Sequence, residues 1–281
     1  MTQLAGCWIG HWTGEGTGVT VVIPPTGTVA SGEVRGGAPA TREFALLDPS
    51  KMVSQVDAVV LSGGSAFGLA AGDGVMKLLH ERERGFQTLA GTVPIVVGMS
   101  LFDGQLGDAA PGAEQGRLAA LAALNDDPLV VGKHGAGTGA TSGKWRMQFA
   151  PGGFGWAEVE GVTAIAAVNP WGDVIATDGT PLFPSDADPA GTPKPFQNTT
   201  LVVIITEAQL SKADCYLIAQ SGHDGFARAL NPAHTRFDGD ATVVLATGAS
   251  EAEPDLDAIR AAATQAVAAA IRHAALSGAG R

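Results

Sequence analysis

The stretch Asn198-Thr199-Thr200-Leu201-Val202-Val203-Ile204-Ile205 places two threonines directly before a continuous apolar run. Most of that run is β-branched, which is typical of a buried strand. The residues before it, 180–196, contain five prolines, which are Pro181, Pro184, Pro189, Pro193 and Pro195. Because proline removes backbone donors and resists helices and central strands, we expect an exposed connector that leads into a buried strand.

The Asn198–Thr199 bond lies at the join between this connector and this strand. An extended loop here presents a hydroxyl residue at the first position of the strand. If the Asn198–Thr199 bond breaks, Thr199 gains a free α-amine beside its own hydroxyl. Nucleophile and base then belong to one residue, as an N-terminal-nucleophile enzyme requires. The sequence therefore raises the hypothesis of self-cleavage before Thr199.

Length and composition place the chain among globular proteins. Its 281 residues can bury a sizeable core, in one large domain or two smaller ones, and a hydrophobic share of 45% excludes a disordered chain. The formal charge of -11 argues against a nucleic-acid partner and against polyanionic substrates. Two cysteines make no disulfide framework, and the amino-terminal stretch lacks a basic segment followed by an apolar core. No apolar run approaches the roughly 20 residues that span a bilayer. We therefore expect a soluble, cytoplasmic protein without a membrane partner.

Strand and helix signals alternate along the chain. Strands are expected at residues 18–23, 58–61, 93–97 (as an edge strand), from 199 onward and at 241–245, with two more between 156 and 175 joined by a turn at 169–173. Helices are expected at 67–79 with Ser65 as N-cap, at 210–230 and at 255–276.

Glycine-rich segments offer competing chemistries that their surroundings disfavour. Residues 135–140 superficially fit a dinucleotide fingerprint, but residues 141–145 do not continue as a helix with an apolar face. The pair Gly143-Lys144 misses the phosphate-loop pattern, because tryptophan follows the lysine. Around Ser65 the Gly-x-Ser-x-Gly elbow fails, since Phe67 occupies its last position. We therefore expect no bound nucleotide cofactor.

The histidines show no metal-ligand spacing. No pair occupies positions i and i+4 on a helix beside a carboxylate, and His223 on the expected helix 210–230 is interpreted as solvent-facing or as a satisfied core residue. We therefore expect no metal. The six are His11, His80, His134, His223, His234 and His273.

Several blocks of sequence, taken in order, carry a family resemblance. They are residues 10–13, 17–21, 34–43, 61–70, 137–144, 168–174, 198–201 and 238–240. Through these blocks the chain resembles the self-processing family that includes the DmpA-type aminopeptidases and the nylon-oligomer hydrolase. Matching blocks in the right order are far more specific than any single motif.

The resemblance implies both a fold and an activity. The fold is an α/β sandwich with two sheets between helix layers (αββα), as in the DmpA and ornithine-acetyltransferase types. The chain is then one domain, 1–281, that cleaves itself between Asn198 and Thr199 into a large α-subunit region, 1–198, and a small β-subunit region, 199–281. The new amino-terminal residue hydrolyses amide bonds of a small peptide or oligoamide, as an aminopeptidase or an endo-hydrolase. A homo-oligomer, a tetramer of αβ units, is also implied.

The resemblance also assigns roles to particular residues. Thr199 is the expected nucleophile, and after cleavage its α-amine, with an ordinary pKa of about 7.7–8.0, suits a general base. Asp238 and Asp240 match an acidic pair that orients this amine or holds a proton; if extended, they face one side of the strand. From the residues alone, a polar turn before the strand at 241 is the alternative.

Two further residues complete the expected site. Asn169 is the expected amide donor to the oxyanion, although an Asn-Pro turn is the alternative. Lys144 is the expected cation beside the aspartates or the tetrahedral intermediate, and a solvated lysine beside Trp145 is the alternative. The aminopeptidase branch has a tyrosine near the block matching residues 101–103, whereas the one tyrosine here is Tyr216. Thr199 with two aspartates favours the nylon-hydrolase branch.

Three functions from different classes remain open at this point. The first is a self-processing amidohydrolase or peptidase. The second is an acyltransferase of the ornithine-acetyltransferase type, which shares the self-cleavage and passes the acyl group to an amine. The third is an uncleaved binding protein that keeps the fold without catalysis.

Overall fold

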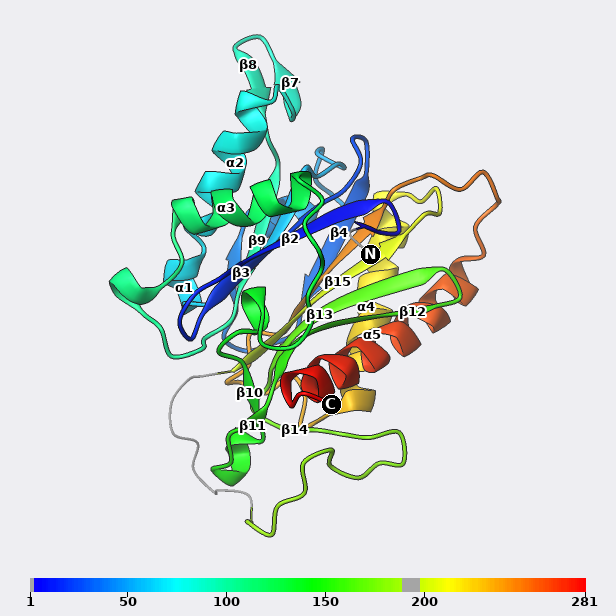
Figure 1. Ribbon diagram of the computed structural model, residues 1–281. Helices are drawn as coiled ribbons and strands as arrows, with labels where there is room; N and C mark the ends of the chain where they lie inside the picture. Colours follow the sequence, from blue (N-terminus) through cyan, green and yellow to red (C-terminus); the bar gives the residue numbers. More distant parts are fainter. Residues whose placement is uncertain (1–2, 189–197) are drawn as a thin grey trace.

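The computed structural model describes residues 3–188 and 198–281, which are built around two β-sheets (Figure 1). The first sheet has the strand order β1 (Gln3–Leu4), β2 (Cys7–Thr13), β3 (Gly18–Ile23), β6 (Ala58–Ser62), β9 (Val96–Ser100) and β5 (Ala40–Arg42). The second has the order β12 (Gly153–Val159), β13 (Val162–Asn169), β15 (Thr199–Thr206), β17 (Ala241–Ala246) and β4 (Val29–Val34). The apolar run after Thr199 therefore forms the middle strand of the second sheet.

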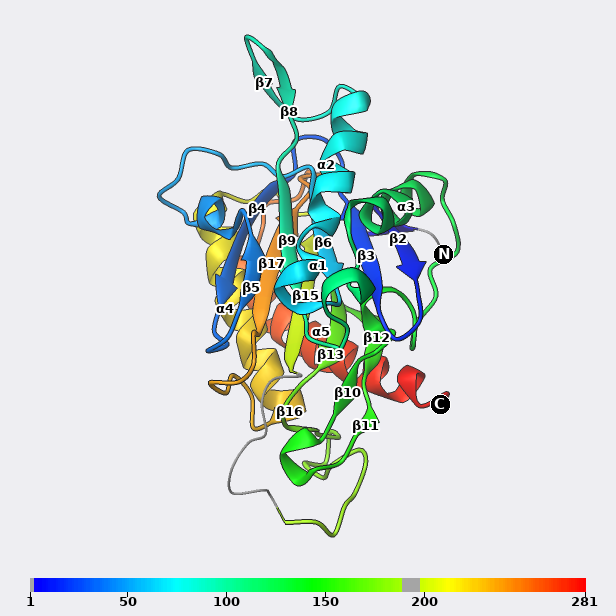
Figure 2. The same cartoon turned by 90° about the vertical axis from the view of Figure 1, so that its left-hand side faces the viewer.

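Two helices cover the outer face of each sheet, so the molecule has four layers (Figure 2). Helices α2 (Ala71–Glu81) and α3 (Ala113–Leu124) share an apolar cluster with β3 and β6 of the first sheet. Helices α4 (Lys212–Ala229) and α5 (Leu256–Gly278) share another with β13 and β15 of the second. A third cluster lies between the two sheets. This arrangement is the expected αββα sandwich, and that prediction is confirmed.

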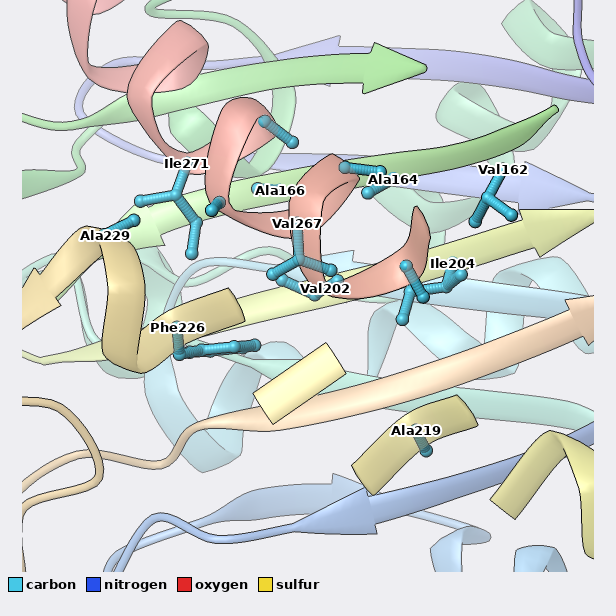
Figure 3. Close-up of a cluster of buried hydrophobic side chains, with 14 of the residues drawn as sticks. Val162, Ala164, Ala166, Val202, Ile204, Ala219, Phe226, Ala229, Val267 and Ile271 are labelled. Atoms are coloured by element: carbon cyan, nitrogen blue, oxygen red, sulfur yellow. The ribbon is translucent and has the colours of Figure 1, made fainter. Parts of the chain in front are cut away.

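Strand β15 explains how one run of sequence serves two of these clusters. All eight of its residues are buried. Val202 and Ile204 join the cluster under α4 and α5, while Leu201, Val203 and Ile205 join the cluster between the sheets. Successive side chains of a strand point to opposite faces, so a strand with apolar residues at both parities must lie between two apolar layers. Figure 3 shows Val202 and Ile204 among the side chains of the outer cluster, with Phe226 of α4 and Val267 and Ile271 of α5.

Short elements connect these layers. A one-turn helix α1 (Ser65–Gly68) precedes α2, and short 3-10 helices lie at Phe44–Leu47, Gly107–Ala109, Gly135–Gly137 and Lys144–Arg146. Three two-stranded ribbons pair β7 (Phe86–Thr88) with β8 (Gly91–Val93), β10 (Thr141–Ser142) with β11 (Ala150–Pro151), and β14 (Asp173–Val174) with β16 (Leu230–Asn231). The β7–β8 hairpin projects beyond α2 (Figure 1).

The sheet register brings three strand ends together at one point. Strand β13 runs antiparallel to β15 and ends at Asn169, which is the register partner of Thr199. Strand β17 runs parallel to β15 and starts at Ala241, beside Leu201. The residues immediately before β17, which include both aspartates of the expected pair, must therefore lie next to the start of β15.

Several sequence expectations are confirmed and three are wrong. Strands at 18–23, 58–61 and 241–245 and helices near 210–230 and 255–276 are present. The edge position for 93–97 is wrong, because Val96 begins β9, and β9 lies between β6 and the short β5. Ser65 is not the N-cap of its helix, since Gly64 occupies that position and Ser65 itself has a φ of 54°.

The third correction concerns the turn between β12 and β13. The expected hairpin turn at 169–173 instead joins β13 to β14, and the hairpin turns at Glu160 and Gly161. Both residues have positive φ, as a tight two-residue hairpin requires. In the proline-rich connector, Pro189, Pro193 and Pro195 lie outside the described residues, whereas residues 181–188 are half-buried or exposed, as expected. Among the described residues, no helix combines the length and apolarity needed to cross a bilayer.

A pair of matched leucines tests how much the core between the sheets stabilises the fold. Leu245 of β17 is fully buried in that core, whereas Leu89 at the tip of the β7–β8 hairpin is fully exposed. Leu245→Ala should lower the free energy of unfolding by about 2–5 kcal/mol, because it removes buried methyl groups and leaves a cavity. Leu89→Ala should change it by less than about 0.5 kcal/mol. Urea denaturation of both variants measures this difference, and equal effects would contradict the described layering.

Candidate active site

Thr199 begins β15 in an unusual backbone conformation. Its φ is 135°, and the residue is only 4% exposed. A positive φ is strained for a β-branched residue and costs on the order of 1–3 kcal/mol, so the surrounding structure must hold it in place. The Thr199 hydroxyl accepts a hydrogen bond from the Gly239 N–H at 2.9 Å. The strain and this bond both concentrate at the residue that follows the expected scissile bond.

Gly239 is required by the close approach of three backbone segments. A β-carbon at this position would lie 2.7 Å from the Thr199 hydroxyl oxygen and 2.8 Å from the Ala38 carbonyl oxygen. The segment leaving β4 fixes this turn, because the Ala38 N–H donates to the Asp238 carbonyl at 2.8 Å and the Gly36 N–H donates to the Asp240 carbonyl at 3.1 Å. The block at 34–43 therefore supports the acidic pair physically.

Asp238 is a buried carboxyl with a proton affinity suited to neutral pH. One of its oxygens accepts the Trp171 N–H at 3.0 Å, and the other accepts the N–H and the hydroxyl of Thr235 at 3.1 and 2.5 Å. Burial, together with the nearby charge of Asp240, raises the pKa of Asp238 to about 7, although these hydrogen bonds act to lower it. Asp238 can therefore gain or lose a proton near neutral pH.

Asp240 holds the backbone next to the nucleophile. Its Oδ1 accepts the Thr200 N–H at 2.8 Å, and its Oδ2 accepts the backbone N–H of His234 at 3.0 Å. The ring Nδ1 of His234 lies 2.9 Å from the same Oδ2. The sequence alone does not identify His234 and Thr235 as site residues. Their contacts with Asp238 and Asp240 appear only when the loop before β17 is folded.

Asn169 connects three parts of the chain beside Thr199. Its Oδ1 accepts from the Thr141 N–H at 2.9 Å and from the Lys144 Nζ at 2.7 Å. Its Nδ2 donates to the Phe102 carbonyl at 2.8 Å. Because the side-chain oxygen is held by two donors, the amide N–H is directed toward Phe102. Its role as a donor to the oxyanion stays a prediction.

Lys144 is almost completely buried and contacts Asn169 twice, through the side-chain oxygen and through the backbone carbonyl at 3.0 Å. Burial moves the pKa of Lys144 well below its ordinary value, while the charge of Asp238 opposes that shift. The alternative of a solvated lysine is therefore wrong. A direct cationic role toward the aspartates stays a prediction.

A small cavity of about 170 Å³ opens beside Thr199. Its apolar walls include Phe102, Phe237, Ala38 and Ala40. On the other side of the expected scissile bond, the Asn198 Nδ2 donates to the Phe237 carbonyl at 3.3 Å, and the buried Asn198 Oδ1 has no hydrogen-bond partner among the described residues. The structure thus brings all five sequence-predicted residues to one point, next to a space that accepts a small group.

Two other kinds of site, a metal site and a phosphate-binding loop, were also considered from the sequence. Within residues 3–188 and 198–281, no three His, Cys, Asp or Glu side chains are arranged to hold a metal ion. The glycine-rich segment at 135–137 forms a single 3-10 turn, and its neighbours are the side chains of His11 and Thr20. That segment therefore packs against β2 and β3, and it does not open a phosphate-binding helix.

Comparison with known proteins gives a family match and a shared fold. Peptidase family S58 matches residues 1–280. An uncharacterised aminopeptidase of Mycobacterium leprae is 42% identical over 92% of this chain and 81% of its own length. A 6-aminohexanoate-oligomer endohydrolase of Agromyces is 28% identical over 84% of this chain and 71% of its own length. The solved structure of a β-aminopeptidase of Burkholderia covers 97% of this chain and 85% of that one, with a TM-score of 0.73 at 23% identity, which establishes the shared fold.

The raised pKa of Asp238 predicts a specific pH dependence of stability. The folded state holds this proton more tightly than the unfolded state, so the free energy of unfolding should fall as pH rises from about 4 to about 7. Asp238→Asn should remove that part of the slope, by roughly 1–3 kcal/mol across the window. Urea denaturation between pH 4 and 8 measures this slope, with every variant in a Thr199→Ala background so that the expected self-cleavage does not interfere.

The control is Glu253→Gln, because Glu253 is an exposed carboxylate. It should leave the slope between pH 4 and 7 unchanged. If Asp238→Asn and Glu253→Gln give the same slope, Asp238 does not hold a proton in the folded state.

Proposed function

The chain belongs to peptidase family S58 and is an amide-bond hydrolase, and we propose that Thr199 is its nucleophile, released when the chain cuts its own Asn198–Thr199 bond. The observation that carries this proposal is the geometry of Thr199. A buried, β-branched residue at a φ of 135° begins a central strand, and a backbone N–H already holds its hydroxyl. Strain of this kind clusters at functional sites.

Self-cleavage is proposed as an acyl shift followed by hydrolysis. The Thr199 hydroxyl oxygen attacks the Asn198 carbonyl carbon, the C–N bond breaks, and the hydroxyl proton moves to the departing amine. This leaves Asn198 esterified on the Thr199 hydroxyl. Water then cleaves the ester and leaves a carboxyl on Asn198 and a free amine and hydroxyl on Thr199. Breaking the bond also releases the strain at φ of Thr199.

The neighbouring residues supply what both reactions need. We assign Asp240 as the fixed acceptor that holds the Thr200 N–H, and Asp238 as the carboxyl that exchanges a proton near neutral pH. The freed α-amine of Thr199 then acts as general base toward its own hydroxyl. These assignments give each of the two aspartates a separate task, consistent with their separate hydrogen-bond partners.

Asn169 and Lys144 are proposed to stabilise the oxyanion. Lys144 and the Thr141 N–H fix the Asn169 oxygen, so the Asn169 amide N–H points to the Phe102 side, where the cavity lies. A preorganised donor of this kind contributes roughly 2.7–4 kcal/mol to lowering a barrier. Lys144 also holds the Asn169 backbone carbonyl at 3.0 Å, so both of its contacts fix the orientation of the proposed donor.

The proposed substrate is a small peptide or an oligoamide. The cavity of about 170 Å³, whose walls combine aromatic and alanine side chains with Ser65 and Ser100, suits a short acyl group next to Thr199. Amide hydrolysis by related chains, one named for 6-aminohexanoate oligomers and one named an aminopeptidase, supports this substrate class. Transfer of the acyl group to an amine, the alternative left open by the sequence, would appear as an acylated product when an amine is added.

The two fragments are proposed to remain one folded unit after the cut. Strand β15 of the fragment 199–281 pairs with β13, and β17 pairs with β4, both of which belong to residues 1–198. Separating the fragments would therefore break the second sheet on both sides. They should co-purify and separate only in denaturant.

The exposed β7–β8 hairpin and the two buried cysteines are the features from which assembly and location are proposed. The β7–β8 hairpin exposes Phe86, Leu89 and Val93, which supports contact with a second copy in a homo-oligomer. Light scattering of purified protein measures the oligomeric state.

A cytoplasmic location is proposed because Cys7 and Cys215 are both buried free thiols, as in reducing compartments.

Substitutions at the two adjacent threonines test the nucleophile directly. Thr199→Ala should leave the chain uncut and lower the hydrolysis of amino-acid anilides and 6-aminohexanoate oligomers by at least about 10³-fold, because the attacking oxygen is gone. Thr200→Val is the matched control, since the buried Thr200 hydroxyl has no hydrogen-bond partner among the described residues. It should still be cut and active.

For both variants, electrophoresis under denaturing conditions measures cleavage of the chain, and a hydrolysis assay measures activity. Thr199→Ser should also be cut, because it keeps the hydroxyl. Cleavage of Thr199→Ala at the same bond, or its full activity, would remove Thr199 from the mechanism.

A further inference from the structure

His234 lies behind the acidic pair, on the side away from the nucleophile. It contributes two donors to one oxygen of Asp240, namely its backbone N–H at 3.0 Å and its ring Nδ1 at 2.9 Å. The other oxygen of Asp240 accepts the Thr200 N–H at 2.8 Å. One carboxylate therefore connects the His234 ring to the peptide that follows Thr199.

Both ring nitrogens of His234 face oxygen atoms. Nδ1 faces the Asp240 carboxylate, and Nε2 lies 3.4 Å from the backbone carbonyl of His223. A carboxylate oxygen accepts hydrogen bonds, so the tautomer with a proton on Nδ1 donates to Asp240 in the shorter of the two contacts. The side chain is 18% exposed, and that of Asp240 is 1% exposed, so their interaction is only partly screened by solvent.

Aromatic packing fixes the orientation of the ring. The His234 ring is 5.1 Å from the Phe226 ring and 4.7 Å from the His223 ring, measured between centroids. Both neighbours belong to α4, which packs against the second sheet. The ring thus joins the helix layer to the loop that carries Asp238 and Asp240.

We propose that His234 is a positioning residue for self-cleavage, which holds the Asp240 carboxylate in place and so fixes the Thr199–Thr200 backbone for attack. The inference rests on the proposed function, because it takes Thr199 as the nucleophile. His234 does not line the cavity beside Thr199, and it acts through Asp240.

The two aspartates are held by different partners. Asp240 receives the His234 ring and the Thr200 N–H, whereas Asp238 receives the Trp171 N–H and the Thr235 N–H and hydroxyl. Without the ring contact, the Asp240 side chain would lose one of its donors and could turn away from the Thr200 N–H.

Other ionisable groups around the ring do not replace this contact. The His223 ring, from α4, is held neutral because burial lowers its pKa to about 3. Glu33 and Arg35, from β4 and just after it, lie beyond His223, with Glu33 3.9 Å from the His223 ring and Arg35 paired to Glu33. On its own loop, His234 is followed by Arg236, whose guanidinium lies over the Phe237 ring, and by Asp238.

The test follows self-cleavage of the full chain made by cell-free synthesis, sampled over time by denaturing electrophoresis at several pH values. His234→Phe keeps an aromatic ring but removes the donor, and it should slow cleavage by about 10–100-fold through loss of positioning. The pH profile of its cleavage rate should also differ from that of the parent chain, because the ring contact to Asp240 is gone.

Two amide variants separate positioning from packing. The side-chain nitrogen of asparagine can occupy the place of Nδ1, whereas that of glutamine occupies the place of Nε2. His234→Asn should therefore restore cleavage to within about threefold of the parent, and His234→Gln should remain slow. His80→Asn, on the distant α2, is the matched control and should cleave at the parent rate.

The outcomes are distinct. If His234→Phe and His234→Gln cleave at the parent rate with the parent pH dependence, the positioning role is overturned. If His234→Asn and His234→Gln are equally slow, the ring acts through packing and the proposal also fails. If Thr199→Ala is cut in the same assay, the proposed function itself fails, whatever the His234 variants do.

Discussion

The position of β15 between β13 and β17 is the constraint on which the site depends. Its apolar residues belong to two core clusters at once, so the strand cannot shift along the sheet without exposing one set to the wrong layer. That fixed register places Thr199 opposite Asn169 and beside the residues that precede β17. The strained φ of Thr199 is tolerated because the strand behind it is held on both sides.

Electrostatics at the strand end follow from burial. Lys144, Asp238 and Asp240 are all nearly inaccessible to solvent, and each is held by named hydrogen bonds. Burial lowers the pKa of Lys144 and raises that of Asp238, which brings both toward neutral pH.

Much of this could be predicted from the sequence, and the rest has a physical reason for remaining hidden. The apolar run after Thr199 indicates a buried strand because such side chains must leave water, and the layered fold followed from the family resemblance. The contacts of His234 depend on how the loop before β17 folds back, which no local pattern encodes. The interior position of β9 was missed because its partner β5 has only three residues. Gly239 is explained by the approach of Ala38 and Thr199, which are distant in sequence.

The central claim is that the Asn198–Thr199 bond is broken to make the enzyme. Intact-mass measurement of active, purified protein under denaturing conditions tests it most directly. The account predicts two species, one that ends at Asn198 and one that consists of residues 199–281 and begins Thr-Thr-Leu-Val-Val. A single uncut chain in a preparation that hydrolyses amides, or a fragment that begins at another residue, would contradict it.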